Sequence, residues 1–254
     1  MLKRLPRRLD PGEEATLVEH LGELRGRIVI SLATTGVAFI VAFAFHERLV
    51  NWLTEPLPDG HKLVTFGVTE PFTTSIKVSF YAAAAFALPV VLYQLWSFLA
   101  PAVDHNIQRV VAVFVALSTA LFASGVAFSY FIALPRALDF LVNYDSNLYE
   151  SQIRASYYYS FVSLMLLAMG LVFELPIFIL ALVRLRVLTA DKLRRNRRIG
   201  YVGVIVVAIL LPTVDPVSLV FESVPLLLLF EGSIWLSVVM ERRWERSGAL
   251  AADL

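Results

Sequence analysis

The chain has 254 residues, of which 58% are hydrophobic and 17% are charged, and its mean hydropathy is +0.71. Soluble domains typically contain about 45–50% apolar and about 25% charged residues, so this composition excludes an ordinary water-soluble domain and indicates lipid as the solvent. The chain contains no cysteine, which excludes disulfides, thiolate nucleophiles and cysteine-based metal sites. The net charge of +1 conceals an uneven distribution of Lys and Arg along the chain.

Residues 1–27 predict an amphipathic helix that lies on the membrane surface. Asp10 suits the N-cap position of such a helix, and Pro11 suits its first turn. A stripe of apolar residues at helical spacing follows, made up of Leu17, Leu21, Leu24 and Ile28. An ordinary amphipathic lead-in to the first membrane span explains the same pattern, and both interpretations stay open.

Six runs with few or no charges approach the roughly 20 apolar residues that a transmembrane helix needs. The fourth run continues past Glu174, and the sixth is interrupted by Glu222 and Glu231. The runs cover residues 28–45, 78–103, 110–135, 155–183, 199–214 and 216–240. No segment between them is long enough for a second domain. We therefore predict a single all-α, polytopic membrane domain over 1–254, with six transmembrane helices and a cytoplasmic tail at 241–254.

The connections at 46–71 and 136–154 are rich in turn-forming residues and predict short ordered caps. Basic residues avoid these connections and cluster in the alternate ones, with 17 on one side and 5 on the other, out of 22 in all. The larger group comprises Lys3, Arg4, Arg7, Arg8, Arg25, Arg27, Arg109, Arg184, Arg186, Lys192, Arg194, Arg195, Arg197, Arg198, Arg242, Arg243 and Arg246. By the positive-inside bias, this split predicts that both termini are cytoplasmic.

Proline and short spans shape the rest of the prediction. Pro89 and Pro225 lie within the second and sixth spans and predict kinks there. The run at 199–214 has a length of about 24 Å at roughly 1.5 Å per residue, less than the ~30 Å hydrocarbon core. The turn Pro212–Pro216 leaves almost no external loop. The last two helices are therefore expected to be short, with the bilayer thinned around them or neighbouring helices shielding them.

Charges inside the membrane are the sharpest functional indication, because an ionised group at mid-bilayer costs about 2.5–3.5 kcal/mol. Glu174 is such a group, and Pro176 behind it has no N–H to donate to the carbonyl of Val172. We interpret Glu174 as a protonated acid or one that faces a polar cavity; a structural kink with a locally satisfied acid is the alternative. Glu222 and Glu231 point to opposite helix faces and form no acid–base pair.

Catalysis finds little support in the sequence. The four histidines lie at span ends or in connections, without the paired spacing that haem or zinc ligation needs, and comprise His20, His46, His61 and His105. No serine lies in a nucleophile elbow. We therefore expect no enzymatic activity, no metal, no cofactor and no nucleic-acid partner.

Several motifs in order resemble one family. The stretch His20–Arg27 (HLGELRGR) resembles the HLxELRxR signature of TatC, the receptor subunit of the twin-arginine protein translocase. Other matching stretches are Glu70–Phe72, Pro89–Ala102 (PVVLYQLWSFLAPA), Phe173–Pro176, Pro212–Ser218 (PTVDPVS) and Phe230–Glu231. The resemblance covers about residues 15–240.

The resemblance implies a cupped bundle of six helices in a bacterial-type inner membrane. It implies binding of the twin-arginine signal peptides of folded cargo and assembly with single-span TatA and TatB-type partners. Export is then driven by the proton-motive force, and self-association is expected. The implied signal-peptide residues are Glu23, Arg25 and Phe98. The implied intramembrane and partner sites are Glu174, on the concave face, and Glu231.

Structural roles are implied for Pro89, Pro176, Pro212 and Asp215. One position departs from the family. Many TatC sequences carry a glutamate at the start of the third span that helps to bind the arginine pair, and here Ile107 takes that place. Asp104, three residues earlier, is a tentative substitute, although an N-cap role explains it equally well.

Two other classes of function remain as alternatives. The first is a proton-coupled secondary transporter that uses Glu174 as its proton carrier. Such a transporter requires a second polar site at mid-membrane and usually shows repeat symmetry, which this sequence lacks. The second is a purely structural scaffold.

Overall fold

The structure, a computed structural model, describes residues 17–58, 61–99, 107–148, 152–185, 187–213 and 215–252. Two features predicted from the sequence lie outside these residues: the N-cap at Asp10 and the candidate ligand Asp104. The side chain of Ile107 is likewise outside the described part, although its backbone begins a helix.

The described residues confirm an all-α membrane fold. Five helical segments among them are long and apolar enough to cross a membrane: Leu21–Ala44, Glu70–Phe98, Val111–Asn143, Ala155–Arg184 and Pro216–Arg242. The predicted fifth span forms α9 (Arg197–Ile209), whose 13 residues extend only about 20 Å. This helix is therefore as short as the sequence predicted. The last helix was expected to be short as well, but α10 (Pro216–Ala252) is continuous over 37 residues, so that part of the prediction is wrong.

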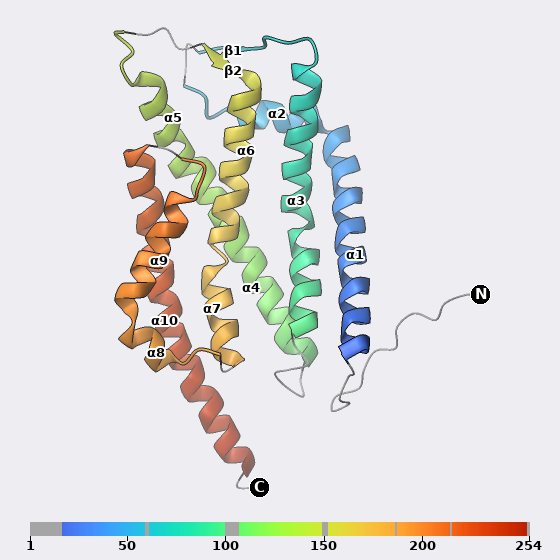
Figure 1. Cartoon of the computed structure of the whole chain (residues 1–254), viewed down its shortest axis with the longest axis vertical. Helices are drawn as coiled ribbons and strands as arrows, with labels where there is room; N and C mark the ends of the chain where they lie inside the picture. The colour runs from blue at the N-terminus through green and yellow to red at the C-terminus, as the bar shows by residue number, and fades with distance from the viewer. Residues whose placement is uncertain are drawn as a thin grey trace, which may run out of the picture.

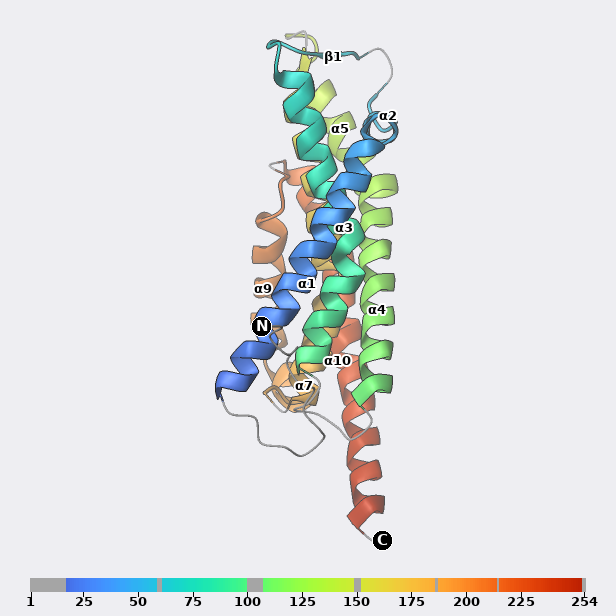
Figure 2. The ribbon, with the colours of Figure 1, turned by 90° about the vertical axis from the view of Figure 1, so that its right-hand side faces the viewer.

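The first span differs from the prediction of a separate surface helix. Helix α1 (Leu17–Ala44) is continuous over 28 residues, and Figure 2 shows it as one rod. No proline interrupts it, and the glycines Gly22 and Gly26 do not stop it. Of the two interpretations left open, the continuous helix favours the amphipathic lead-in over a separate surface helix, so the stripe from Leu17 onward is the first part of the first span.

The third span extends further than predicted. Helix α4 (Ile107–Phe128) passes through a π-helical turn, η2 (Ser129–Ala133), into α5 (Leu134–Asn143). The expected connection at 136–154 is thus helical over its first part. Pro135 does not break the helix, because it lies in the first turn of α5, where its missing N–H costs little.

The fourth span is broken immediately before Pro176, where a structural kink was the alternative interpretation of the sequence. Helix α6 (Ala155–Val172) ends before the turn at Phe173 and Glu174, and α7 (Leu175–Arg184) begins immediately after it. Pro176 lies in the first turn of α7. In contrast, α3 (Glu70–Leu99) and α10 (Pro216–Ala252) continue through Pro89 and Pro225.

The helices stand side by side in one bundle (Figure 1). Helix α1 packs on α3, α3 packs on both α4 and α6, and α10 packs on α7 and α9. The start of α1, the short helix α8 (Ala190–Arg195) and the end of α10 lie at one end of the bundle. Helix α2 (His46–Thr54) and the two strands lie at the opposite end.

A small cap closes that opposite end. Strand β1 (Leu63–Val64) pairs in parallel with β2 (Ile153–Arg154). Arg154 Nε donates to Oε1 of the buried Glu70 at 2.9 Å, and the guanidinium lies 5.2 Å from the ring centre of Tyr157. The hydrogen bond that Arg154 donates to Glu70 raises the pKa of Arg154. This ion pair joins the start of α3 to the start of α6.

Glycines allow α4 and α6 to approach closely. A Cβ atom at Gly125 would lie 2.8 Å from the carbonyl oxygen of Met169, and one at Gly170 would lie 2.5 Å from the ring of Phe122. Both distances are below normal contact: Gly125 of α4 lies against the backbone of α6, and Gly170 of α6 makes room for the Phe122 ring of α4. Small residues at helix interfaces have this role in membranes, where burial of apolar surface does not itself drive helices together.

We predict that Gly125→Ala destabilises the protein by about 1–3 kcal/mol, because the neighbouring Met169 carbonyl belongs to backbone and has little room to move. The midpoint of thermal unfolding in detergent measures the effect. Gly36→Ala is the matched control, since nothing lies within 4 Å of the added methyl group. Equal midpoints for the two variants would contradict close packing at Gly125.

Candidate functional site

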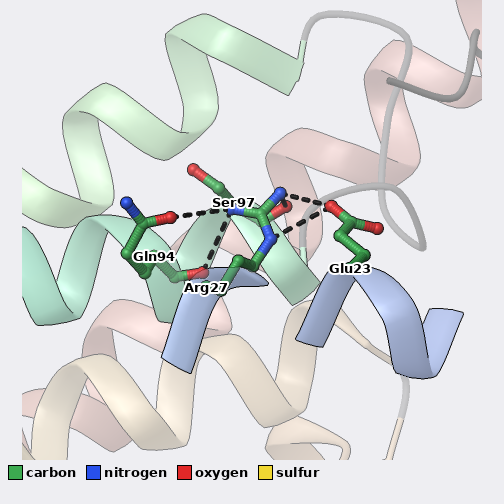
Figure 3. Close-up of polar contacts among 4 residues, drawn as sticks. All are labelled: Glu23, Arg27, Gln94 and Ser97. Carbon is green, nitrogen blue, oxygen red and sulfur yellow. Dashed lines mark hydrogen bonds and ion pairs between the residues drawn. The ribbon is translucent and has the colours of Figure 1, made fainter. Parts of the chain in front are cut away.

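A polar cluster joins the start of α1 to the end of α3 (Figure 3). Arg27 Nε donates to Glu23 Oε1 at 3.0 Å, and Arg27 Nη2 donates to the same oxygen. The two residues are one helical turn apart, the spacing at which side chains on a helix meet. The Glu23 side chain is 29% exposed and that of Arg27 is 20% exposed. A carboxylate at the surface is therefore held by a more deeply placed cation.

The same guanidinium reaches across to α3. Arg27 Nη1 lies 3.4 Å from the backbone oxygen of Gln94 and 3.3 Å from its side-chain Oε1. Arg27 Nη2 donates to the backbone oxygen of Ser97 at 3.1 Å. Ser97 is in the last turn of α3, where helix carbonyls lack partners within the helix. Arg27 thus caps α3 and fastens it to α1.

The structure places the other predicted signal-peptide residues near this cluster. Arg25 is exposed on α1, two residues from Glu23. Phe98 is half-buried and follows Ser97 at the end of α3. The side chains of Asp104, the candidate second acid, and of Ile107, which takes the place of the family's glutamate, are outside the described part of the structure.

Glu174 is buried inside the bundle and not on an open face. Its side chain is in the turn between α6 and α7 with the residue only 1% exposed, and neither carboxyl oxygen has a hydrogen-bond partner among the described residues. Ser118 of α4 lies beside the carboxyl group, outside hydrogen-bond geometry, and accepts a 3.4 Å bond from the indole of Trp96. The α6–α7 turn is therefore enclosed against α4 in this conformation, and the position of Glu174 on a concave face stays a prediction.

A second buried acid, on α10, is bonded to the turn between α9 and α10. Glu222 is completely buried, and its Oε2 accepts a 2.7 Å hydrogen bond from Thr213 Oγ1. Asp215 Oδ1 accepts from the backbone N–H of Ser218 at 2.7 Å, which caps the start of α10. Pro212 lies in the same turn, just after α9.

Glu231 lies on the other side of α10, between α9 and α10. Its Oε1 accepts a hydrogen bond from the hydroxyl of Tyr201, and its Oε2 is 3.6 Å from Arg197 Nη2. The Glu231 side chain is 27% exposed. Glu222 and Glu231 thus face the interior and a partly open surface respectively, as their spacing predicts. Among the described residues, no group of acidic or histidine side chains is arranged to hold a metal ion.

Comparisons with known proteins agree on one family. The sequence profile described as "Sec-independent protein translocase protein (TatC)" matches residues 19–225. The chain belongs to the TatC family. Because this family is a protein translocase component and the chain has several apolar helices, the chain is a multi-pass membrane protein.

Individual relatives of the TatC family match almost the whole chain. The TatC protein of Desulforapulum autotrophicum is 35% identical over 87% of this chain and 84% of its own length. The TatCd protein of Bacillus subtilis is 35% identical over 94% of this chain and 98% of its own length. A crystal structure entitled "Twin Arginine Translocase Receptor- TatC in DDM" is 34% identical, with a TM-score of 0.77 over 86% of this chain and 99% of that one.

Some residues of the cluster were not singled out from the sequence. Arg27 belongs to the TatC signature, and its spacing from Glu23 was a usable indication of an ion pair. Gln94 and Ser97 gave no such indication, because their contacts with Arg27 depend on how α3 docks on α1. The bond from Thr213 to Glu222 likewise depends on the path of the α9–α10 turn.

We predict that Thr213→Val destabilises the protein by about 1–3 kcal/mol, because it leaves the buried Glu222 carboxyl group without its hydrogen-bond donor. Thermal unfolding in detergent measures this loss. Adding Glu222→Met should restore much of the stability, since both polar partners are then gone. Thr73→Val, at an exposed position, is the control. A wild-type midpoint for Thr213→Val would show that the bond contributes nothing.

Proposed function

We propose that this chain is the receptor subunit of a twin-arginine translocase and binds the signal peptides of folded cargo proteins. The observation that carries the proposal is the partly exposed Glu23 carboxylate, held between α1 and α3 in a chain of the TatC family. A solved relative with the same fold is entitled a twin-arginine translocase receptor, which supports the same function here.

The chemistry of the Glu23 site suits an arginine ligand. A carboxylate accepts hydrogen bonds from a guanidinium that are shorter and stronger than those between neutral groups. Phe98, at the end of α3, offers an apolar surface for neighbouring peptide side chains, and Arg25 lies on the same part of α1. Recognition by both charge and apolar contact favours a peptide over a lone cation.

Partners of the TatA and TatB type are proposed to contact α9 and α10. Apolar side chains on α9 are exposed, namely Ile199, Val202, Ile205, Val206 and Ile209. The partly exposed Glu231, with its bond from Tyr201, places a polar group on this surface. Glu174 is proposed as a polar contact for the peptide or a partner within the membrane. Because it is buried in the described conformation, this role requires the α6–α7 turn to open on binding. Self-association and proton-motive-force-driven export complete the proposal.

The alternative of a proton-coupled secondary transporter has less support. It assigns proton transfer to Glu174, which is enclosed within the bundle beside Ser118, while the other buried acid, Glu222, is bonded at the α9–α10 turn. Membership in a protein translocase family favours the receptor function. We therefore do not adopt the transporter.

We predict that the purified protein binds a signal peptide with two consecutive arginines and that Glu23→Gln weakens binding about tenfold or more, since hydrogen bonds to charged groups contribute about 1.5–3 kcal/mol. Ile107→Glu should tighten binding by roughly 0.5–1.5 kcal/mol by adding the family's second acid. Isothermal titration measures these affinities, and Glu47→Gln, in α2 at the far end, is the control.

Equal binding of the twin-arginine peptide and its double-lysine analogue by the wild-type protein would refute the proposed function. An unchanged affinity in Glu23→Gln, with selective binding preserved, would instead show that the peptide arginine binds to another acid. Asp104→Asn then tests the remaining candidate, because asparagine keeps an N-cap and removes the charge.

The membrane orientation is proposed from the 17-to-5 distribution of basic residues, which places both termini in the cytoplasm of a bacterial-type cell. In support, the start of α1 and the end of α10 lie at the same end of the bundle (Figure 1). Since the chain lacks cysteine, single cysteines at Asn147 and Lys192 can be labelled in whole cells. We expect an impermeant maleimide to label Asn147→Cys only. Labelling of Lys192→Cys from outside would show that the orientation in the membrane is the opposite of the one proposed.

A further inference from the structure

We infer that Arg27 is a positioning residue for signal-peptide recognition: it occupies one oxygen of the Glu23 carboxylate and directs the other to the peptide arginine. The inference rests on the proposed function. Arg27 then takes part in recognition of the twin-arginine motif without touching the peptide, because the Glu23 carboxylate accepts hydrogen bonds from two guanidinium groups at once.

All five N–H donors of Arg27 have acceptors. Nε donates to Glu23 Oε1, and Nη2 donates both to that oxygen and to the backbone oxygen of Ser97. Nη1 uses its two hydrogens on the backbone oxygen and the side-chain oxygen of Gln94. A guanidinium offers five donors in a planar fork, so this environment is matched to arginine. Lysine has only three donors and lacks the fork.

The contacts with α3 fix the guanidinium in place. Two of its acceptors are backbone carbonyls, whose positions depend on the helix and not on a side-chain rotamer. Arg27 therefore has little freedom to swing toward solvent. Because it is fixed, it also restrains the Glu23 carboxylate, which would otherwise move on an exposed helical turn.

The geometry leaves the second oxygen of Glu23 for a ligand. Both bonds from Arg27 end on Oε1. Figure 3 shows that Oε2 points away from Arg27. A carboxylate has about four acceptor positions, two on each oxygen, so a second guanidinium can share it without displacing the first. The peptide arginine thus meets an acceptor of set position and direction.

A carboxylate held in this way should favour arginine over lysine. Restraint before binding lowers the entropic cost of forming directional hydrogen bonds, and the planar fork of arginine depends on direction more than a rotating ammonium does. Neutralisation of Glu23 by Arg27 also weakens the purely electrostatic attraction for any cation. The ratio of affinities for the double-arginine and double-lysine peptides is therefore the quantity that Arg27 controls.

The test is a double-mutant cycle with purified protein in detergent. Titrations use a twin-arginine signal peptide and its double-lysine analogue against wild type, Arg27→Lys, Glu23→Gln and the double variant. We expect Arg27→Lys to weaken arginine-peptide binding about 5–20-fold with a smaller effect on the lysine peptide. In the Glu23→Gln background, Arg27→Lys should cause no further loss, since it acts through that carboxylate.

Gln94→Met provides a second variant that leaves both helices and the ion pair in place. It removes one acceptor of Arg27 and keeps the side-chain length, so we expect a smaller loss of about 2–5-fold and the same shift in peptide preference. Arg48→Lys, at the far end of the bundle, is the charge-matched control and should bind like wild type. Thermal unfolding of each variant shows which proteins are folded. If Arg27→Lys is unfolded, the peptide affinities of Gln94→Met test the role of Arg27.

Three results would overturn the inference while leaving the proposed function intact: wild-type affinity in Arg27→Lys and Gln94→Met, equal losses for both peptides, or additive losses with Glu23→Gln. If Glu23→Gln abolishes all binding, additivity cannot be measured. The ratio of affinities for the two peptides in Arg27→Lys and Gln94→Met then decides whether Arg27 controls the preference. A wild-type protein that does not distinguish the two peptides would refute the proposed function itself.

Discussion

In lipid, an apolar side chain gains little by moving from the solvent into the protein, so helix association depends on close packing and on polar contacts between helices. This constraint explains where the bundle is held together. Gly125 lets α4 approach the backbone of α6, and Gly170 leaves room on α6 for the Phe122 ring of α4. Elsewhere, ion pairs and hydrogen bonds connect segments that hydrophobic burial alone would leave loosely associated.

The polar contacts are concentrated at the ends of the helices, where backbone groups lack helical partners. At one end, Arg27 uses carbonyls of the last part of α3, and at the other end Arg154 joins α3 to α6 through Glu70. Tyr158 donates to the backbone oxygen of Leu53 and so holds α2 against the bundle. The candidate peptide site is a by-product of this arrangement, since the residue that fastens α1 to α3 also restrains Glu23.

Two buried acids, Glu174 and Glu222, depart from this pattern and lie in or beside interruptions of the helices. Glu174 occupies the turn between α6 and α7, and Glu222 is bonded across the turn between α9 and α10. In both places the backbone is irregular, and membranes tolerate irregular backbone where protein encloses it. The α6–α7 turn, with an acid that lacks a partner among the described residues, is accordingly the part of the bundle most suited to rearrangement.

The sequence by itself determined the membrane class, the approximate spans, the break before Pro176, the short α9 and the family, because each depends on composition, local backbone chemistry or contiguous motifs. It left open whether the start of α1 is separate from the first span, and it missed the extension of the third span into α5, since amphipathic or proline-containing stretches are compatible with both helix and connection. Only the tertiary structure decided the environment of the acids. Arg27 meets Gln94 and Ser97 across 67 and 70 residues of chain, and the burial of Glu174 follows from how α4 packs. Such contacts depend on the rotation and docking of whole helices, which lipid-facing apolar side chains leave unspecified in the sequence pattern.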